Sequence, residues 1–209
     1  MLKTDKVKIA VLVSGGGTNL QALLENERAG MIPDGKIELV LSNNPNAYAL
    51  KRAENFGVKA VCISKQDYPN FADRENKMIE VLKENGIQLI VLAGYLSILS
   101  QNFTTTFADR IINIHPSLIP SFCGAGYYGL KVHESALAYG VKVTGATVHY
   151  VNEIPDGGKI IMQKAVEIQE GDTAEILQKK VMEQAEWIIL PQATQKVCKL
   201  LKGENYERL

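Results

Sequence analysis

Excess charge is the first thing that this 209-residue chain lacks, since Lys plus Arg and Asp plus Glu number 23 each. A balanced charge supplies no overall field that would attract nucleic acid or an anionic membrane, so we expect neither as a partner. The chain has only three cysteines, Cys62, Cys123 and Cys198, without a C-x-x-C pair, which is typical of free thiols in a reducing cytosol. No window approaches the roughly 18 apolar residues of a membrane span. The sequence therefore predicts a cytoplasmic protein.

Short apolar runs alternate with amphipathic segments along the chain. This alternation predicts an α/β fold in which helices cover both faces of a mostly parallel sheet. The last two strands are close enough in sequence to pair antiparallel at one edge. We expect strands at 7–13, 36–41, 58–63, 87–92, 111–115, 143–151 and 159–168. We expect helices at 18–30 (capped by Thr18 and Asn19), 47–56, 71–84, 133–139 and from Thr173 onward, the last with Ile176, Leu177, Val181 and Ala185 on one face.

A glycine-rich loop follows the first strand, at residues 14–19. Its glycines free backbone N–H groups to bind an anion, such as a phosphate, at the start of the next helix. Leu20 holds the third glycine position of a dinucleotide fingerprint, and no Gly-Lys-Ser/Thr of a P-loop occurs. A tight turn without a ligand explains the loop equally well.

Asn113 and His115 end the strand at 111–115, and Pro116 prevents its continuation. Side chains two apart on a strand project to the same side, here at the carboxyl end where open α/β sheets bind ligands. A lone buried histidine is more often a core residue, but two adjacent polar side chains would be costly to bury without partners. Together they offer an amide donor and an imidazole that could hold a carbonyl oxygen as it becomes an oxyanion.

Asp156 lies in a Pro-Asp-Gly-Gly stretch, which is also an ordinary hairpin turn. If this turn folds over the end of the His115 strand, its carboxylate would favour the protonated imidazole and could accept a proton from a nucleophile. The sequence alone leaves both readings open.

Five motifs in order resemble those of the phosphoribosylglycinamide formyltransferase family: SGGGTNL (14–20), LAGYLSIL (92–99), INIHPSLIP (112–120), GATVHYV (145–151) and Asp-Gly-Gly (156–158). The resemblance implies a single-domain, Rossmann-like formyltransferase fold over 1–209. The phosphate-binding half would span about 1–100, and the folate-binding and catalytic half about 101–209.

The implied reaction transfers the formyl group of 10-formyltetrahydrofolate, as co-substrate, to the amine of glycinamide ribonucleotide in purine (IMP) biosynthesis. Asn113 and protonated His115 would hold the oxygen of a tetrahedral intermediate, and Asp156 would raise the affinity of His115 for its proton and help to move a proton to the folate nitrogen. No metal is required.

The resemblance also implies binding residues. Those for the ribonucleotide are Gly16, Gly17, Thr18, Asn19, Arg74 and Glu186, with Glu183 an alternative to Glu186. Those for folate are Leu96, Ser97, Ile98, Leu99, Asn113, Asn152, Glu153, Ile154 and Pro155. Thr147 and His149 would support the catalytic residues from behind. Ser97 and Pro155 stand where the family often has arginine and leucine.

Other hypotheses remain open at this point. Methionyl-tRNA formyltransferases and formyltetrahydrofolate deformylases share the Asn, His and Asp pattern but carry a further domain, for which we see no room. A nucleotide-dependent oxidoreductase lacks support from the glycine loop, and a catalytically silent nucleotide-binding module would not need all three polar residues. His115, His133 and His149 lack the spacing of a zinc site. We expect small-molecule substrates and a monomer or homodimer.

Overall fold

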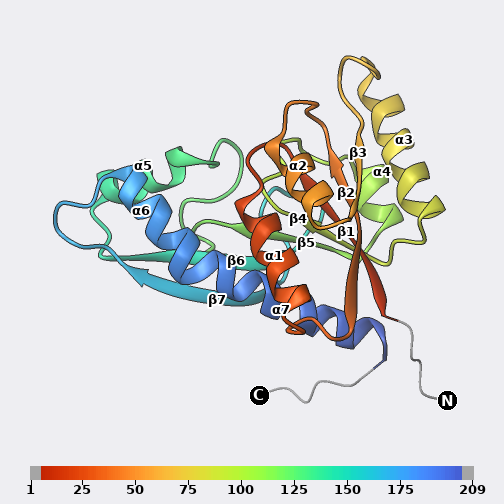
Figure 1. Ribbon diagram of the computed structural model, residues 1–209. Helices are drawn as coiled ribbons and strands as arrows, with labels where there is room; N and C mark the ends of the chain where they lie inside the picture. The colour runs from red at the N-terminus through yellow and green to blue at the C-terminus, as the bar shows by residue number, and fades with distance from the viewer. Residues whose placement is uncertain (1–5, 204–209) are drawn as a thin grey trace.

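A seven-stranded sheet forms the centre of the computed structural model, which describes residues 6–203 (Figure 1). The strands lie in the order β3-β2-β1-β4-β5-β6-β7. Five of them pair in parallel, and β6 and β7 extend the sheet antiparallel, as the sequence predicted. Their bounds are β1 Val7–Val13, β2 Gly35–Ser42, β3 Lys59–Cys62, β4 Leu89–Leu92, β5 Ile111–His115, β6 Val143–Tyr150 and β7 Ile160–Glu167.

Helices cover both faces of this sheet. Along β1, Ile9 and Val11 pack into one apolar cluster, whereas Ala10 and Leu12 pack into another, which explains why the strand is apolar throughout from residue 9 to residue 13. The first cluster includes α1, α2, α6 and α7, and the second includes α3 and α4. The helices are α1 Thr18–Arg28, α2 Tyr48–Asn55, α3 Phe71–Glu84, α4 Gln101–Thr106, α5 Leu130–Tyr139, α6 Ala174–Val181 and α7 Trp187–Leu201. None of those in residues 6–203 combines the length and apolarity that a membrane-spanning helix needs.

Several boundaries differ from the sequence prediction. Helix α1 is not capped by Thr18 or Asn19, which are its first two residues; the N-cap is Gly17 in a left-handed conformation, with φ of 74°. Helix α5 begins at Leu130 rather than at 133, and the short helix α4 was not predicted at all. The side chain of Ser100 caps α4 by accepting a hydrogen bond from the backbone N–H of Phe103.

The last helix is interrupted, although the sequence predicted one continuous helix. A π-helical segment, η1 (Met182–Glu186), joins α6 to α7. Four residues of an α-helix exceed one turn by about 40°, so a stripe of buried residues at every fourth position drifts around the helix. The wider π turn offsets this drift. The prediction that Ile176 shares a face with Leu177, Val181 and Ala185 is wrong, because Ile176 is 46% exposed whereas the others are buried. The buried stripe is Leu177, Val181, Ala185, Ile189, Ala193 and Val197.

The position of the site in the fold follows from the strand order, which reverses direction between β1 and β4. Strand β1 has β2 on one side and β4 on the other, so the connections leave the sheet in opposite directions at the carboxyl ends of β1 and β4. Open α/β sheets bind ligands in the crevice that forms at such a point. Strand β5, which ends at His115, lies next to β4 and brings its last residues to the same edge.

Candidate active site

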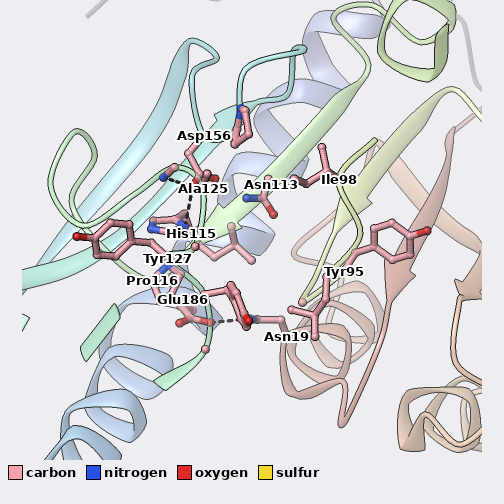
Figure 2. Close-up of a pocket in the computed structure, with 18 of the residues that line it drawn as sticks. Asn19, Tyr95, Ile98, Asn113, His115, Pro116, Ala125, Tyr127, Asp156 and Glu186 are labelled. Atoms are coloured by element: carbon pink, nitrogen blue, oxygen red, sulfur yellow. Dashed lines mark hydrogen bonds and ion pairs between the residues drawn. The ribbon is translucent and has the colours of Figure 1, made fainter. Parts of the chain in front are cut away.

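An open pocket of about 380 Å³ lies at this edge of the sheet (Figure 2). It is lined from opposite sides by residues far apart in the sequence: the loop after β4, the end of β5, the segment before α5, the turn before β7, and the α6–η1 helix. The predicted residues that it brings together are Asn19, Leu96, Ser97, Ile98, Asn113, His115, Pro155, Asp156 and Glu186.

Asn113 and His115 lie at the floor of this pocket, on the side of β5 that the alternation of the strand predicted. Strand β6 faces them in antiparallel register, with His149 opposite Asn113 and Thr147 opposite His115. The amide nitrogen Nδ2 of Asn113 lies 3.2 Å from Nε2 of His149. His149 in turn donates from Nδ1 to its neighbour's backbone carbonyl, that of Tyr150, at 2.7 Å. This tautomer leaves Nε2 to accept from Asn113.

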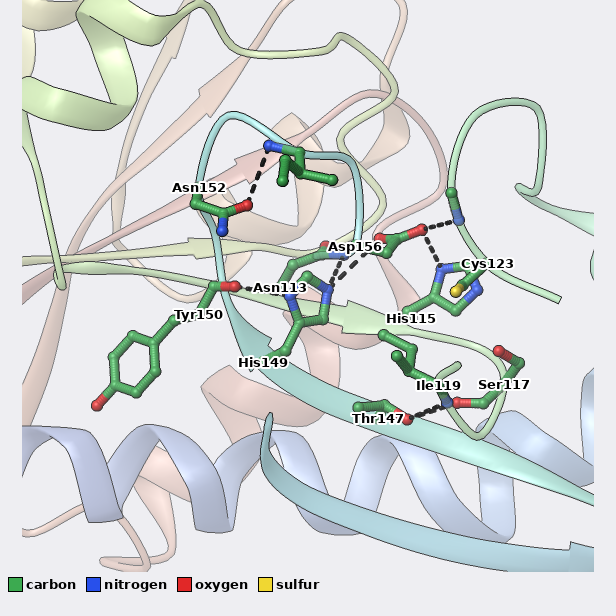
Figure 3. A network of polar contacts seen from close by, with 12 residues as sticks. Asn113, His115, Ser117, Ile119, Cys123, Thr147, His149, Tyr150, Asn152 and Asp156 are labelled. Carbon is green, nitrogen blue, oxygen red and sulfur yellow. Dashed lines mark hydrogen bonds and ion pairs between the residues drawn. The ribbon is translucent and has the colours of Figure 1, made fainter. Parts of the chain in front are cut away.

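Asp156 joins the two histidines (Figure 3). Its Oδ2 lies 3.3 Å from Nδ1 of His115 and its Oδ1 lies 3.4 Å from Nε2 of His149. The same Oδ2 accepts a hydrogen bond from the backbone N–H of Gly124 at 2.8 Å. The turn that carries Asp156 therefore folds over the end of the His115 strand. A role for Asp156 beside the imidazole of His115 requires this arrangement.

The carboxylate of Asp156 stays ionised although it is half-buried. Burial acts to raise the pKa of Asp156, but the proximity of the His115 and His149 rings and the hydrogen bond from the Gly124 N–H outweigh it and leave this pKa below its usual value. A negative charge is thus fixed beside two imidazole rings. The loop before α5 helps to hold the carboxylate in place through the N–H of Gly124.

At His115, burial prevails over the nearby negative charge. Burial lowers the pKa of His115 below its usual value. The carboxylate of Asp156 and the carbonyl of Phe122 oppose this effect, as predicted for Asp156, but they do not overcome it. The Phe122 carbonyl lies 2.9 Å from Nε2 of His115, so both ring nitrogens face an acceptor. The surroundings can therefore hold a second ring proton once the ring acquires one.

Thr147 lies on β6, opposite His115 on β5, and does not line the pocket. Its hydroxyl donates to the carbonyl of Ser117 at 2.7 Å and accepts from the N–H of Ile119 at 3.1 Å. These bonds fix the turn that follows His115 and Pro116. His149 thus holds Asn113, which faces the pocket, whereas Thr147 holds the turn that follows the pocket residues His115 and Pro116.

Glu186 closes the opposite side of the pocket. Its side chain is buried, and Oε2 accepts a hydrogen bond from Nδ2 of Asn19 at 2.6 Å. Burial raises the pKa of Glu186 to about 7, and the bond from Asn19 opposes this shift. Glu183, the alternative acid, is exposed and pairs with Lys179 at 3.8 Å. Of the two acids, Glu186 is the one that lines the pocket.

A second, smaller cleft of about 120 Å³ adjoins the first and shares Asn113 and Asp156 with it. Its lining is largely apolar, which suits a flat ring system better than a charged group. Leu96 lines only the larger pocket. The predicted folate residues in the smaller cleft are Ser97, Ile98, Leu99, Asn113, Asn152, Glu153, Ile154 and Pro155.

Four predicted ribonucleotide residues line neither cavity. Gly16, Gly17 and Thr18 belong to the loop beside Asn19, and Thr18 contacts Met182 through its hydroxyl. Arg74 is on α3, where its guanidinium donates to the carbonyl of Tyr68 at 2.8 Å and lies over the ring of Phe71. The structure does not bring Arg74 to the pocket wall.

The pocket also contains residues that the sequence prediction missed, among them Tyr95, Tyr127, His133, Gln178 and Met182. His133 is fully buried, and its ring nitrogens have no hydrogen-bond partner among residues 6–203. Burial lowers the pKa of His133 to about 4, with a smaller contribution from His115. Gln178, Met182 and Glu186 recur at every fourth position, and this spacing was the signal in the sequence that one helix face reaches the site.

Comparison with known proteins gives the class to which this arrangement belongs. A family model described as formyl transferase matches residues 7–194, which covers the strands, the glycine loop and the three polar residues of the pocket. The fold and the site thus define a formyl transferase.

Individual relatives narrow this class. The chain is 40% identical over 184 residues to the phosphoribosylglycinamide formyltransferase of Haemophilus influenzae, covering 88% of this chain and 84% of the relative. A crystal structure of glycinamide ribonucleotide transformylase 1 from Symbiobacterium toebii superimposes with a TM-score of 0.86 at 39% identity, covering 97% of this chain and 91% of that one. The chain belongs to the phosphoribosylglycinamide formyltransferases of this family.

Longer relatives contain the same unit. The trifunctional purine biosynthetic protein adenosine-3 of Gallus gallus is 42% identical over 197 residues, which are 94% of this chain but 19% of that protein. The chain thus spans about a fifth of the length of these relatives.

Proposed function

We propose that this protein transfers the formyl group of 10-formyltetrahydrofolate to the amine of glycinamide ribonucleotide, a step of de novo purine biosynthesis. The observation that carries this proposal is the convergence of Asn113, His115 and Asp156 where two cavities meet. An amide donor, an imidazole and a carboxylate are the groups that acyl transfer to an amine requires, because an oxyanion must be stabilised and a proton must leave the amine.

The two cavities suit the two substrates. The larger pocket reaches from the catalytic residues to Asn19 and Glu186 beside the glycine loop, so it suits a ribonucleotide whose phosphate binds at that loop. Glu186 offers a carboxyl group to the ribose or the amine. The smaller, apolar cleft suits the pterin ring of the folate, and a ring bound there would lie beside Asn113 and Asp156.

The reaction begins when the lone pair of the free amine attacks the formyl carbon. A C–N bond forms, and the formyl oxygen becomes an oxyanion in a tetrahedral intermediate. The Nδ2 group of Asn113 carries two hydrogens, so one can bind this oxygen while the other stays on His149. Collapse of the intermediate breaks the bond to the folate nitrogen and releases tetrahydrofolate and the formylated ribonucleotide.

His115 takes up its second proton from solvent water as the oxyanion forms and returns it to solvent when the intermediate collapses. Developing negative charge on the oxygen offsets the burial that lowers the pKa of His115 in the free protein. Because Asp156 lies at Nδ1, it can stay in place while the ring becomes an imidazolium. The Phe122 carbonyl at Nε2 must yield if His115 is to bind the oxygen directly.

Asp156 also lies where the proton must travel. The attacking amine loses a proton, and the folate nitrogen gains one as it leaves. An ionised carboxylate that lines both cavities can receive the first proton and, through water, deliver it to the second position.

We also propose a domain organisation, a compartment and an assembly for this protein. A single formyltransferase domain is supported by the one continuous sheet to which both halves contribute strands. A cytoplasmic reaction is supported by three free cysteines, which suit a reducing compartment. A monomer or a homodimer remains our prediction for the assembly.

Loss of 10-formyltetrahydrofolate, followed by absorbance, tests the proposed function. We expect turnover with glycinamide ribonucleotide and none without it. Asn113→Ala should lower kcat about 100-fold or more, because one oxyanion donor is lost. Asn102→Ala, which changes an exposed asparagine on α4, is the matched control and should leave kcat unchanged. Consumption that does not depend on the ribonucleotide would indicate a deformylase, and no consumption would indicate a silent binding module.

A further inference from the structure

Three successive carbonyl groups of the glycine loop are each bound by a donor from the segment 44–52, which runs from the end of β2 into α2. The Ser14 carbonyl accepts from the side chain of Asn44 at 3.1 Å. The Gly15 carbonyl accepts from the N–H of Ala49 at 3.1 Å. The Gly16 carbonyl accepts from Nε of Arg52 at 2.8 Å. One segment therefore holds every carbonyl of the loop before its last glycine.

The N–H groups of the same peptide units consequently point away from this segment, because the C=O and N–H of a trans peptide lie on opposite sides. Within residues 6–203, no hydrogen bond is made by the backbone N–H groups of residues 15–19. Space is open around Gly15 and Gly16, where an added Cβ would meet nothing within 4 Å. Free N–H groups that face open space form the kind of concave surface that binds an anion.

Arg52 is the charged member of this arrangement, and its guanidinium is held in place. Nη1 donates to Oε1 of Gln21, in the first turns of α1, at 3.0 Å. The guanidinium also lies over the ring of Tyr48, 5.1 Å from its centroid. With two hydrogen bonds and a ring contact, Arg52 places a fixed positive charge directly behind the loop.

We propose that Arg52 sets the affinity of the site for the substrate's phosphate group. It turns the Gly16 carbonyl away from the anion, and its charge attracts the phosphate across the loop. Arg52 is thus a positioning residue for the phosphate loop, whereas the basic residue that the sequence prediction placed near the ribonucleotide was Arg74. This inference rests on the proposed function, since it takes a phosphorylated substrate as the ligand.

The same contacts would be explained if Arg52 only held α2 against α1. Dependence on the phosphate group of the ligand distinguishes this structural role from a role in phosphate binding. The test compares glycinamide ribonucleotide with its riboside, which lacks the phosphate, as substrate or as competing ligand. It uses the whole protein as wild type, Arg52→Gln and Arg52→Lys. Arg28→Gln is the matched control, because Arg28 also lies over a ring, that of Phe56, but at the far end of α1.

Arg52→Gln should raise the KM for the ribonucleotide about tenfold, while kcat and the affinity for the riboside change less than about twofold. The KM of the variant should also depend less on salt, because a charge near the anion has been removed. Arg52→Lys keeps the charge but loses the planar donor group, so its KM should fall between those of wild type and Arg52→Gln. Arg28→Gln should behave as wild type.

Equal loss of affinity for ribonucleotide and riboside, or no loss for either, would overturn the proposal. Calorimetric titration with ribose 5-phosphate gives a measure that does not depend on turnover. Wild type should bind it more tightly than Arg52→Gln does, and equal binding would also overturn the proposal. If wild type binds ribose 5-phosphate but does not consume formyl-folate, the proposed reaction fails while the assignment of Arg52 stands.

Discussion

The carboxylate of Asp156 contacts two imidazole rings, those of His115 and His149. These contacts influence how readily His115 holds a second proton. Burial lowers the pKa of His115, whereas the charge of Asp156 raises it. The balance favours the neutral ring in the free protein. It also leaves the ring ready to gain a proton when negative charge appears on a bound substrate.

Replacement of Asp156 by asparagine should therefore lower the pKa of His115 further, because the charge that opposes burial is removed. The measurement is an NMR titration of the His115 ring. In wild type we expect a midpoint below the usual 6.5, and in Asp156→Asn a lower midpoint still. Asp73→Asn, on the exposed side of α3, should leave the midpoint unchanged. A midpoint that rises in Asp156→Asn would show that the carboxylate does not act on His115 in this way.

Glu186 predicts a pH dependence of stability with the opposite sign to that of most surface acids. Its pKa is raised from 4.5 to about 7, so the folded chain holds this proton more tightly than the unfolded chain does. The stabilising contribution is fully present below pH 4.5 and is lost as the pH rises through about 7. The difference in pKa corresponds to a loss of at most about 3 kcal/mol.

Glu186→Gln should remove this loss, because glutamine keeps an oxygen that can accept from Asn19 and carries no proton to lose. In urea unfolding, the stability of Glu186→Gln relative to wild type should increase from pH 5 to pH 8. The exposed Glu183→Gln serves as the control and should show no such trend. A flat difference for Glu186→Gln would mean that the buried carboxyl does not titrate in this range.

Sequence reasoning identified Asn113 and His115 because a strand has a fixed alternation, so their shared side could be predicted without knowledge of the fold. It could not place Asp156, since a Pro-Asp-Gly-Gly turn leaves its direction to contacts made by distant residues such as Gly124. It did not indicate that burial lowers the pKa of His115, because burial depends on the whole fold.

Among the elements, the loop between β1 and α1 depends on one glycine. Gly17 has a φ of 74°, and an added Cβ would lie 2.6 Å from the Cβ of Ala49. The left-handed backbone alone costs an alanine about 1–2 kcal/mol, and the clash adds to it. Gly17→Ala should therefore lower the free energy of unfolding in urea by more than this, whereas Gly15→Ala has open space and should cost much less. Equal costs for the two variants would contradict this role of Gly17.

The other elements differ in how well the sequence predicted them. Strand β4 is a continuous apolar run and β1 is nearly so, and both were therefore predicted closely. Helix α4, with the sequence QNFTTT, has too few apolar residues to show a helical period, although Ser100 before it is a cap signal. The π turn of η1 escaped because its five residues are ordinary helix formers, and only the four-residue spacing of the buried stripe indicates it.

For the molecule as a whole, the sequence predicted the class of sheet but not the order of its strands. Alternating strands and helices indicated a parallel sheet with covered faces, and the antiparallel edge followed from two neighbouring strands. The position of β1 between β2 and β4 depends on packing between distant residues. That position creates the crevice in which the glycine loop, β5 and the α6–η1 helix meet.

The proposed reaction moves the formyl carbon directly from the folate to the amine of the ribonucleotide. We would supply the protein with 10-formyltetrahydrofolate labelled with ¹³C in the formyl group, together with glycinamide ribonucleotide, and locate the label by NMR. The label should appear on the glycinamide nitrogen of the ribonucleotide, and His115→Ala should slow its appearance about 100-fold or more. Label released as formate, or transfer by His115→Ala at the wild-type rate, would contradict a direct formyl transfer at this site.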